Sequence, residues 1–196
     1  TKRYRQSVRM LTLSLPARQG IAVREVALPI MFTLSKAVNE VVTLAVLDGV
    51  DIVTVAIAEI PEKIVFSTPI GHRSPAYCTA AGKILLACQP ADIWDRLISR
   101  IDFNAYTQQT IVSPDLFKKE LTNARQQGYA TQDGELITSL GSVAAPILNF
   151  HKDVVGAINI SGLSIHILHE DKTDFYISEL VKTAQAISTE MGYRVG

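Results

Sequence analysis

The sequence predicts one α+β domain, in which an antiparallel sheet is flanked by helices. Two hairpin patterns, over residues 41–58 and 142–163, join runs of β-branched and apolar residues through short polar turns. Stretches with apolar residues at helical spacing lie before, between and after these hairpins. Because strands that follow one another as hairpins pair antiparallel, this order favours a layered α+β domain over a parallel α/β sheet.

The composition suits a folded domain that does not bind nucleic acid by itself. Of its 196 residues, 47% are hydrophobic and 19% charged, which is enough to build a sizeable core. Lys plus Arg and Asp plus Glu number 19 each, whereas a nucleic-acid-binding surface normally carries a positive excess. The two cysteines form neither a disulfide framework nor a zinc motif. With no apolar run of membrane length and no recognisable signal peptide, we expect a cytoplasmic protein.

The N-terminal part predicts two helices followed by three strands. The first fifteen residues are basic at the start and carry apolar residues at helical spacing, which favours a short amphipathic helix. Residues 23–38 continue with helical spacing, and Pro29 is expected to kink this helix or loosen one of its turns. The run "EVVTLAVLDGVDIVTVAIAEI" then predicts a hairpin that turns at its Asp-Gly pair. "KIVFST", residues 63–68, predicts a third strand.

The remainder predicts three helices, a second hairpin and a closing helix. Thr79 is expected to cap a helix that ends before Pro90, and "ADIWDRLISRI" predicts a second short helix. Ser113 and the following Pro open a third helix, which Gly128 stops. "SVAAPILNF" and "VVGAINISGL" flank "HKD" and predict a hairpin at the centre of the sheet. Residues 174–192 predict an amphipathic final helix.

The stretch "YCTAAGKILLA" places residues with almost no side chain at the start of a helix. A phosphate-binding loop needs Gly where Tyr77 stands and Ser or Thr where Ile84 stands, so a nucleotide site is excluded. The first turn of a helix presents unpaired N–H groups and a partial positive charge, and small side chains let a ligand approach them. We therefore expect a carboxylate to bind at Thr79, Ala80 and Ala81.

Polar residues within otherwise apolar strands predict the rest of this pocket. Alternation places Asn159 and Ser161 on one face of their strand, and Ser142 on the preceding strand can join them. Hydroxyls and an amide among Val, Ile and Ala suit the floor of a pocket. The segment "IVFSTPI" is expected to add a wall with Phe66 and Ile70. The alternative interpretation is that these polar groups only satisfy neighbouring backbone.

Patterns for catalysis or metal binding are weak. No serine lies in the G-x-S-x-G pattern of a nucleophile elbow. His166 and His169 have the spacing of two zinc ligands, but without a second ligand pair a polar helix entrance explains them better. Residues 132–136 lack the partners of a calcium loop and are interpreted as a turn. Cys78, beside a helix start, is either a reactive thiol or a small, buried, inert residue. We expect no metal and no cofactor.

Two long motifs carry a family resemblance. "RSPAYCTAAGKILLA" combines small residues with Gly-Lys and an apolar run, and "GSVAAPILNFHKDVVGAINISGL" pairs an Ala-Ala-Pro strand with one that ends in Ser-Gly. Together they resemble the two signatures of the effector-binding domain of IclR-family bacterial transcription regulators. "REVALPIM", "NEVVTLAVLDG" and "ARQQGYA" match in the same order, so the resemblance covers about residues 3–193. It implies a GAF-like fold, a small organic acid as effector, and a homodimer or homotetramer.

The resemblance also implies a division of the chain and further ligand contacts. Residues 1–20 would be the end of a linker helix from an absent winged helix-turn-helix module, which alone contacts DNA, and residues 21–196 the effector-binding domain. Contacts carried over by position add Gln132 and its neighbour Asp133, which follow the Gly-Tyr pair. The predicted ligand-binding residues are Phe66, Ile70, Thr79, Ala80, Ala81, Gln132, Asp133, Ser142, Asn159 and Ser161.

The sequence thus predicts a regulator domain that senses a keto, sugar or aromatic acid and modulates the transcription of catabolic genes. It is not expected to be an enzyme. Two alternatives stay open at this point. One is a small hydrolase or isomerase that acts on an organic acid through Cys78 or a loop histidine. The other is a pure dimerisation module whose pocket is vestigial.

Overall fold

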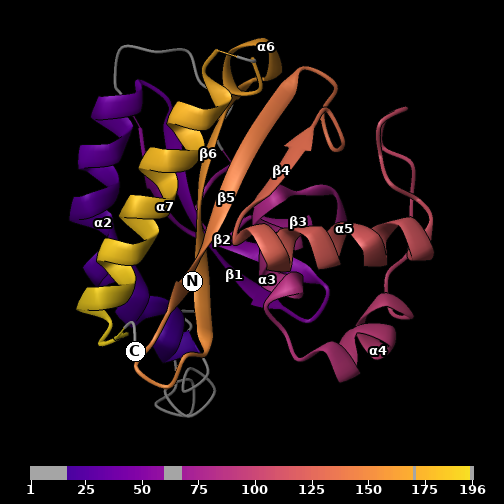
Figure 1. Ribbon diagram of the computed structural model, residues 1–196, viewed down its shortest axis with the longest axis horizontal. Coiled ribbons are helices and arrows are strands. Elements are labelled where there is room, and N and C mark those ends of the chain that lie inside the picture. Colours follow the sequence, from indigo (N-terminus) through magenta and orange to yellow (C-terminus); the bar gives the residue numbers. More distant parts are fainter. Residues whose placement is uncertain (1–16, 60–67, 170, 195–196) are drawn as a thin grey trace, which may run out of the picture.

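A six-stranded antiparallel sheet forms the middle layer of the molecule (Figure 1). The structure is a computed structural model, which describes residues 17–59, 68–169 and 171–194. The strands lie in the order β3-β2-β1-β6-β5-β4, and each is antiparallel to its neighbours, as the predicted α+β class requires. Their bounds are β1 Val41–Asp48, β2 Asp51–Ala58, β3 Arg73–Pro75, β4 Ala130–Asp133, β5 Leu140–Leu148 and β6 Val154–Leu163.

Both predicted hairpins form, and local chemistry explains their turns. Gly49 lies between β1 and β2 with a φ of +68°, in the left-handed region that glycine adopts without a Cβ clash. Between β5 and β6, Oδ1 of Asn149 accepts the N–H groups of His151 and Asp153, at 2.9 and 3.0 Å. Because β6 pairs with β1, the second hairpin lies in the middle of the sheet, as predicted.

Two long helices, α2 (Ala17–Val38) and α7 (Thr173–Glu190), lie side by side on one face of the sheet (Figure 1). Their apolar stripes meet the sheet in a core that includes Val23, Met31 and Leu180. Helix α2 continues through Pro29 to Val38.

The opposite face is covered by α3 (Ala80–Ala87) and α5 (Pro114–Gln127), with α4 (Trp94–Ile98) at its border (Figure 1). The predicted caps of α5 form: the Ser113 hydroxyl accepts the N–H of Leu116, and Gly128 ends the helix with a φ of +78°. Helix α3 lies between α5 and the strands, so all of its residues are buried. It therefore presents its first turn to the sheet rather than to solvent.

Gly82 sets how closely α3 approaches the 3-10 turn Ala76–Cys78 that precedes it. A Cβ at this position would lie 2.2 Å from the carbonyl oxygen of Ala76, far inside van der Waals contact. The glycine of the Gly-Lys pair is thus explained by the packing of backbone against backbone.

The differences from the predicted elements involve short segments. Residues 132–136 were predicted to be a turn, but the first two belong to edge strand β4, and the turn follows at Gly134, with a φ of +65°. A strand of 4 residues is too short for alternation to reveal it. Strand β3 and helix α6 (Ser164–Ile167) were missed for the same reason. The helix expected within residues 1–15 and most of the strand expected at 63–68 lie outside the described residues.

Candidate ligand-binding site

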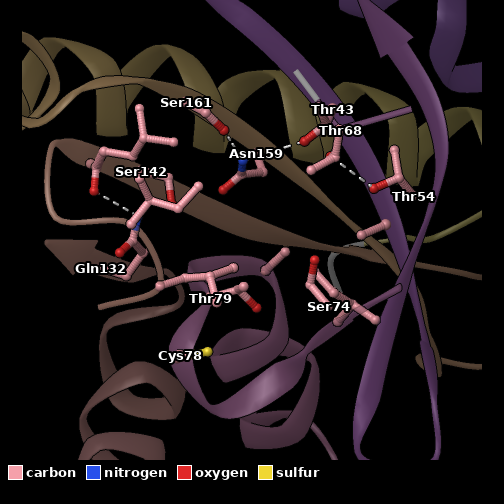
Figure 2. Close-up of a pocket in the computed structure, with 17 residues that line it drawn as sticks. Thr43, Thr54, Thr68, Ser74, Cys78, Thr79, Gln132, Ser142, Asn159 and Ser161 are labelled. Atoms are coloured by element: carbon pink, nitrogen blue, oxygen red, sulfur yellow. Dashed lines mark hydrogen bonds between the residues drawn. The ribbon is translucent and has the colours of Figure 1, made fainter. Parts of the chain in front are cut away.

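A cavity of about 110 Å³ lies between the start of α3 and the sheet (Figure 2). Its polar lining side chains are Thr43, Thr54, Thr68, Ser74, Thr79, Gln132, Ser142, Asn159 and Ser161. The other lining residues are Ala45, Ile52, Cys78, Ala81, Leu136, Ile137, Leu140 and Gly141. None of these described lining residues carries a charge. These residues would therefore hold a bound ion by dipoles and hydrogen bonds.

The floor of the cavity is built by strand register. Ser142 on β5 lies directly opposite Ser161 on β6, and Asn159 lies directly opposite Thr43 on β1. Side chains that face each other across an antiparallel pair point to the same side of the sheet. The structure thus brings together three predicted residues, Ser142, Asn159 and Ser161. It adds Thr43, which the sequence analysis missed although alternation along its strand could have marked it.

The Asn159 side chain is 7% exposed and only partly hydrogen-bonded. Its Nδ2 donates to Oγ of Ser161 at 2.5 Å and to Oγ1 of Thr43 at 3.3 Å. Its carbonyl oxygen, Oδ1, has no hydrogen-bond partner among the described residues. Figure 2 shows this oxygen turned away from both hydroxyl partners. Since buried polar atoms nearly always have partners, the amide is able to accept a hydrogen bond from a ligand.

The start of α3 provides the opposite wall. Oγ1 of Thr79 accepts the N–H of Gly82 at 3.2 Å, so Thr79 is the N-cap that the sequence predicts. No acceptor among the described residues bonds the N–H groups of Ala80 or Ala81. Ala81 lines the cavity, whereas the Ala80 side chain is buried outside its lining. The unused N–H group of Ala81 and the positive end of the helix dipole therefore lie at this wall, and the unused N–H group of Ala80 lies next to it in the same first turn.

Gln132 lines the cavity, but its amide is engaged by its own loop. Its Nε2 donates to the carbonyl oxygen of Leu140, and its Oε1 accepts the N–H of Glu135, both at 3.0 Å. These two bonds connect the Gln132 side chain to both ends of the segment 134–140. Leu136 and Ile137 of that segment form part of the cavity wall. Gln132 thus stabilises this part of the cavity wall through hydrogen bonds.

Behind this segment lies a buried ionic network that sequence reasoning missed. Lys83 is 1% exposed, and its Nζ lies 2.5 Å from Oε1 of Glu135 and 3.1 Å from Oε1 of Glu120. It also donates to the carbonyl oxygen of Thr131 at 3.1 Å. Burial raises the pKa of Glu135, while the charge of Lys83 opposes that shift. The partners are 37 and 52 residues from Lys83 in sequence, so no local spacing could reveal the network.

The Cys78 thiol lines the cavity without the properties of a nucleophile. Burial is the largest cause that raises its pKa to about 12, and the nearby Glu135 carboxylate adds to the shift. The sulfur lies 3.7 Å from the carbonyl oxygen of Pro75. Because the thiolate is the reactive form, this geometry favours the interpretation of an inert buried cysteine.

The remaining predicted residues lie elsewhere. Asp133 is exposed, and its Oδ1 accepts a hydrogen bond from the Ser164 hydroxyl outside the cavity lining. Ile70 is 57% exposed and does not line the cavity, and Phe66 lies outside the described residues. Within the described ranges, no group of three His, Cys, Asp or Glu side chains could hold a metal ion. No helix in that part of the chain is long and apolar enough to span a membrane.

Comparison with known proteins identifies a family. The model described as "Bacterial transcriptional regulator IclR C-terminal" matches residues 17–189. The transcriptional repressor IclR of Escherichia coli K12 is 31% identical over 166 residues, which cover 84% of this chain and 60% of that protein. The regulator KipR of Bacillus subtilis 168 is 28% identical over 171 residues, which cover 87% of this chain and 68% of KipR. The chain thus spans only about two thirds of these relatives.

Solved structures agree with this match. A transcriptional regulator from Rhodococcus sp. RHA1 superposes with a TM-score of 0.83 at 34% identity, over 94% of this chain and 75% of that chain. The C-terminal domain of E. coli KdgR gives 0.78 at 28% identity, over 87% and 99% of the two chains. The relatives are named as regulators of transcription, which points away from an enzyme. The chain therefore belongs to the IclR family of bacterial transcriptional regulators, of which it carries the C-terminal, effector-binding domain.

Proposed function

We propose that the cavity is the effector site of this regulator domain and that it binds a small organic acid. The observation that carries the proposal is the unpartnered carbonyl oxygen of Asn159, across the cavity from the start of α3, where the N–H groups of Ala80 and Ala81 have no acceptor among the described residues. A carboxylate at the start of α3 accepts both N–H groups and gains from the helix dipole. The rest of the acid extends towards the sheet and is contacted by Ser142, Asn159 and Ser161.

The affinity expected from these contacts is moderate. Hydrogen bonds to a charged group contribute about 1.5–3 kcal/mol each, and a helix dipole adds about 1 kcal/mol. Two such bonds and the dipole therefore correspond to dissociation constants on the order of micromolar to millimolar. This range suits a sensor that responds to changes in the concentration of a metabolite.

Binding is coupled to transcription through the whole regulator in this proposal. The acid favours one arrangement of subunits in a homodimer or homotetramer in the bacterial cytoplasm, and a winged helix-turn-helix module before residues 1–20 contacts DNA. Coupling of about 1–3 kcal/mol changes DNA affinity several-fold or more. Relatives named as HTH-type regulators support this division of labour. The inducer-binding domain of PobR from Acinetobacter, which has the same fold (TM-score 0.77, 24% identity), forms a complex with 3-hydroxybenzoic acid as a double mutant.

The enzyme alternative has little support in the cavity. A hydrolase or isomerase needs a nucleophile or a general acid or base beside its substrate. Among the described lining residues, Cys78 is the only side chain that titrates, and its pKa of about 12 keeps it protonated at neutral pH. We therefore propose binding without turnover. The vestigial-pocket alternative is disfavoured because the cavity is open and has unused polar groups.

Titration calorimetry with this chain tests the proposal. The ligands are pyruvate, gluconate and 3-hydroxybenzoate, which represent keto, sugar and aromatic acids. We expect at least one to bind, and Asn159→Ala combined with Ser161→Ala to weaken its affinity by at least about tenfold, because buried hydrogen bonds are lost. Thr122→Ala, an exposed hydroxyl on α5, is the control and should leave binding unchanged. If none of the three acids binds, or if the double variant binds with the same affinity as the wild type, the proposal is contradicted.

A further inference from the structure

We infer that the effector is a hydroxylated aliphatic acid and that Asn159 determines this preference. The inference rests on the proposed function, since it concerns the part of the acid that extends from α3 to the sheet. It assigns a hydroxyl group of the ligand to Oδ1 of Asn159, which accepts its hydrogen bond. A carboxylic acid without a hydroxyl group offers this buried oxygen no donor.

The first argument is the orientation that the Asn159 amide has in the structure. Its nitrogen is held between two hydroxyl oxygens, at 2.5 Å from Ser161 and 3.3 Å from Thr43. In this orientation the carbonyl oxygen is the amide atom left to meet a ligand, and as an acceptor it pairs with a donor. A ketone, a carboxylate and a methylene group have no donor at neutral pH, whereas a hydroxyl group has one. The desolvated oxygen thus discriminates between ligands that are otherwise alike.

The second argument is the chemistry of the walls. Hydroxyl side chains predominate among the polar lining residues, and each can both donate and accept a hydrogen bond, as a ligand hydroxyl can. Ser74 and Ser142 have no hydrogen-bond partner for their hydroxyls among the described residues. No aromatic side chain is among the described lining residues, so none of them offers a ring for an aromatic ligand to stack on. The walls therefore favour an aliphatic chain that carries hydroxyl groups.

The size of the cavity limits the length of that chain. A water molecule occupies about 10–15 Å³ on this measure. The cavity of about 110 Å³ therefore holds on the order of eight groups of that size. A carboxylate with a few hydroxylated carbons matches this volume.

Pairs of acids that differ in one group provide the test, by calorimetry on this chain. Lactate is compared with propionate and with pyruvate. We expect the hydroxylated member of each pair to bind roughly tenfold to a hundredfold more tightly, because the other member leaves Oδ1 of Asn159 unpaired. Equal or tighter binding of propionate, pyruvate or 3-hydroxybenzoate would overturn the inference and leave the proposed function standing. If no acid of the set binds, the proposed function fails, and the inference fails with it.

Variants assign the discrimination to one side chain. Asn159→Leu has a similar volume but no acceptor, so the preference for lactate over propionate should fall towards one while propionate still binds. Asn159→Ala provides the same readout if the leucine variant does not fold, as checked by circular dichroism. Asn123→Leu makes the same change at an exposed position on α5 and should keep the full preference. A preference that survives both Asn159 variants would overturn the role of this residue.

Discussion

At the scale of single residues, Lys83 has a structural role in spite of its place in a Gly-Lys pair. Its three N–H groups meet the carboxylates of Glu120 and Glu135 and the backbone carbonyl of Thr131. No donor is left for a ligand. The side chain instead links α3 to α5 and to the segment 134–140, which forms part of the cavity wall. An anion in the cavity therefore receives no hydrogen bond from the Lys83 ammonium group.

We expect Lys83→Met to destabilise the fold by about 3–5 kcal/mol at pH 7, because Glu135 becomes a buried charge without a counter-ion. Burial already raises the pKa of Glu135 above its ordinary value of 4.5, and loss of Lys83 raises it further. A carboxyl group with a raised pKa in the folded state contributes stability below its unfolded pKa and loses it as the pH rises through the folded pKa. The variant should therefore gain stability relative to the wild type as the pH falls towards 4.5, as measured by urea denaturation.

Two further variants interpret this result. Adding Glu135→Leu removes the unpaired charge and should recover much of the lost stability at pH 7. Lys118→Met removes an exposed lysine paired with Asp95 and should change stability by less than about 1 kcal/mol. If Lys83→Met keeps the stability and pH profile of the wild type, the ionic network around Lys83 does not stabilise the fold.

We expect the two cysteines to react slowly in the folded chain. A thiol with a pKa of about 12, as burial gives Cys78, is roughly one part in ten thousand thiolate at pH 8. Burial raises the pKa of Cys88 to about 11, so this partly buried residue should react first. Iodoacetamide labelling followed by mass spectrometry measures both rates, and urea-unfolded chain provides the reference. Fast labelling of Cys78 in the folded chain would indicate a reactive thiolate and would support the enzyme alternative.

At the scale of elements, the contact between α3 and the preceding 3-10 turn positions the N–H groups of the site. Gly82→Ala places a Cβ against the backbone of Ala76 and should cost about 1–3 kcal/mol or more. Because α3 must move to relieve the clash, acid binding should weaken as well. Thermal melting and calorimetry measure the two effects.

Gly128→Ala separates these effects. It places a Cβ in open space at a φ of +78°, so it should cost about 1–2 kcal/mol through backbone strain alone. It lies at the end of α5, outside the cavity lining, and should leave acid binding intact. If Gly82→Ala binds the acid as tightly as Gly128→Ala does, the position of α3 is not critical for the site.

At the scale of the whole molecule, the sheet separates α3 from the helix pair α2 and α7 (Figure 1), and the cavity lies on the α3 side. Along β6, Asn159 lines the cavity, while its neighbours Ile158 and Ile160 belong to the core under α2 and α7. Adjacent residues of one strand thus lie at the ligand site and in the core under α2, the helix that continues the expected linker. A change in the pairing of β6 would reach both faces of the sheet.

Ligand binding should stabilise the whole domain. At a concentration of one hundred times its dissociation constant, an acid that binds only the folded state adds about 2.7 kcal/mol. For a chain of this size each kcal/mol raises the melting temperature by about 2–4 °C, so we expect an increase of about 5–10 °C in a thermal shift assay. The Asn159→Leu variant should show a smaller increase at the same concentration of a hydroxylated acid. An unchanged melting temperature in the wild type at that concentration would contradict binding to the folded state.

The long elements and much of the candidate site could be predicted from sequence, because their signals are local. The Ser113 cap, the turn at Gly49 and the N-cap Thr79 follow from residue types at fixed spacing, and the structure has all three. Alternation also marked Asn159 and Ser161 as neighbours on one face. Strands β3 and β4 were missed because they have too few residues to show a period.

By itself, the sequence determined the class of fold, the position of the helices and hairpins, and the family, since each is encoded by residues close together in the chain. Only the tertiary structure decided which polar groups are satisfied. In the structure, Lys83 pairs with Glu135, and the Gln132 amide forms hydrogen bonds within its own loop. The Asn159 carbonyl oxygen has no partner among the described residues. Hydrogen bonding and burial depend on segments that are distant in sequence and adjacent in space, and no local pattern contains that information.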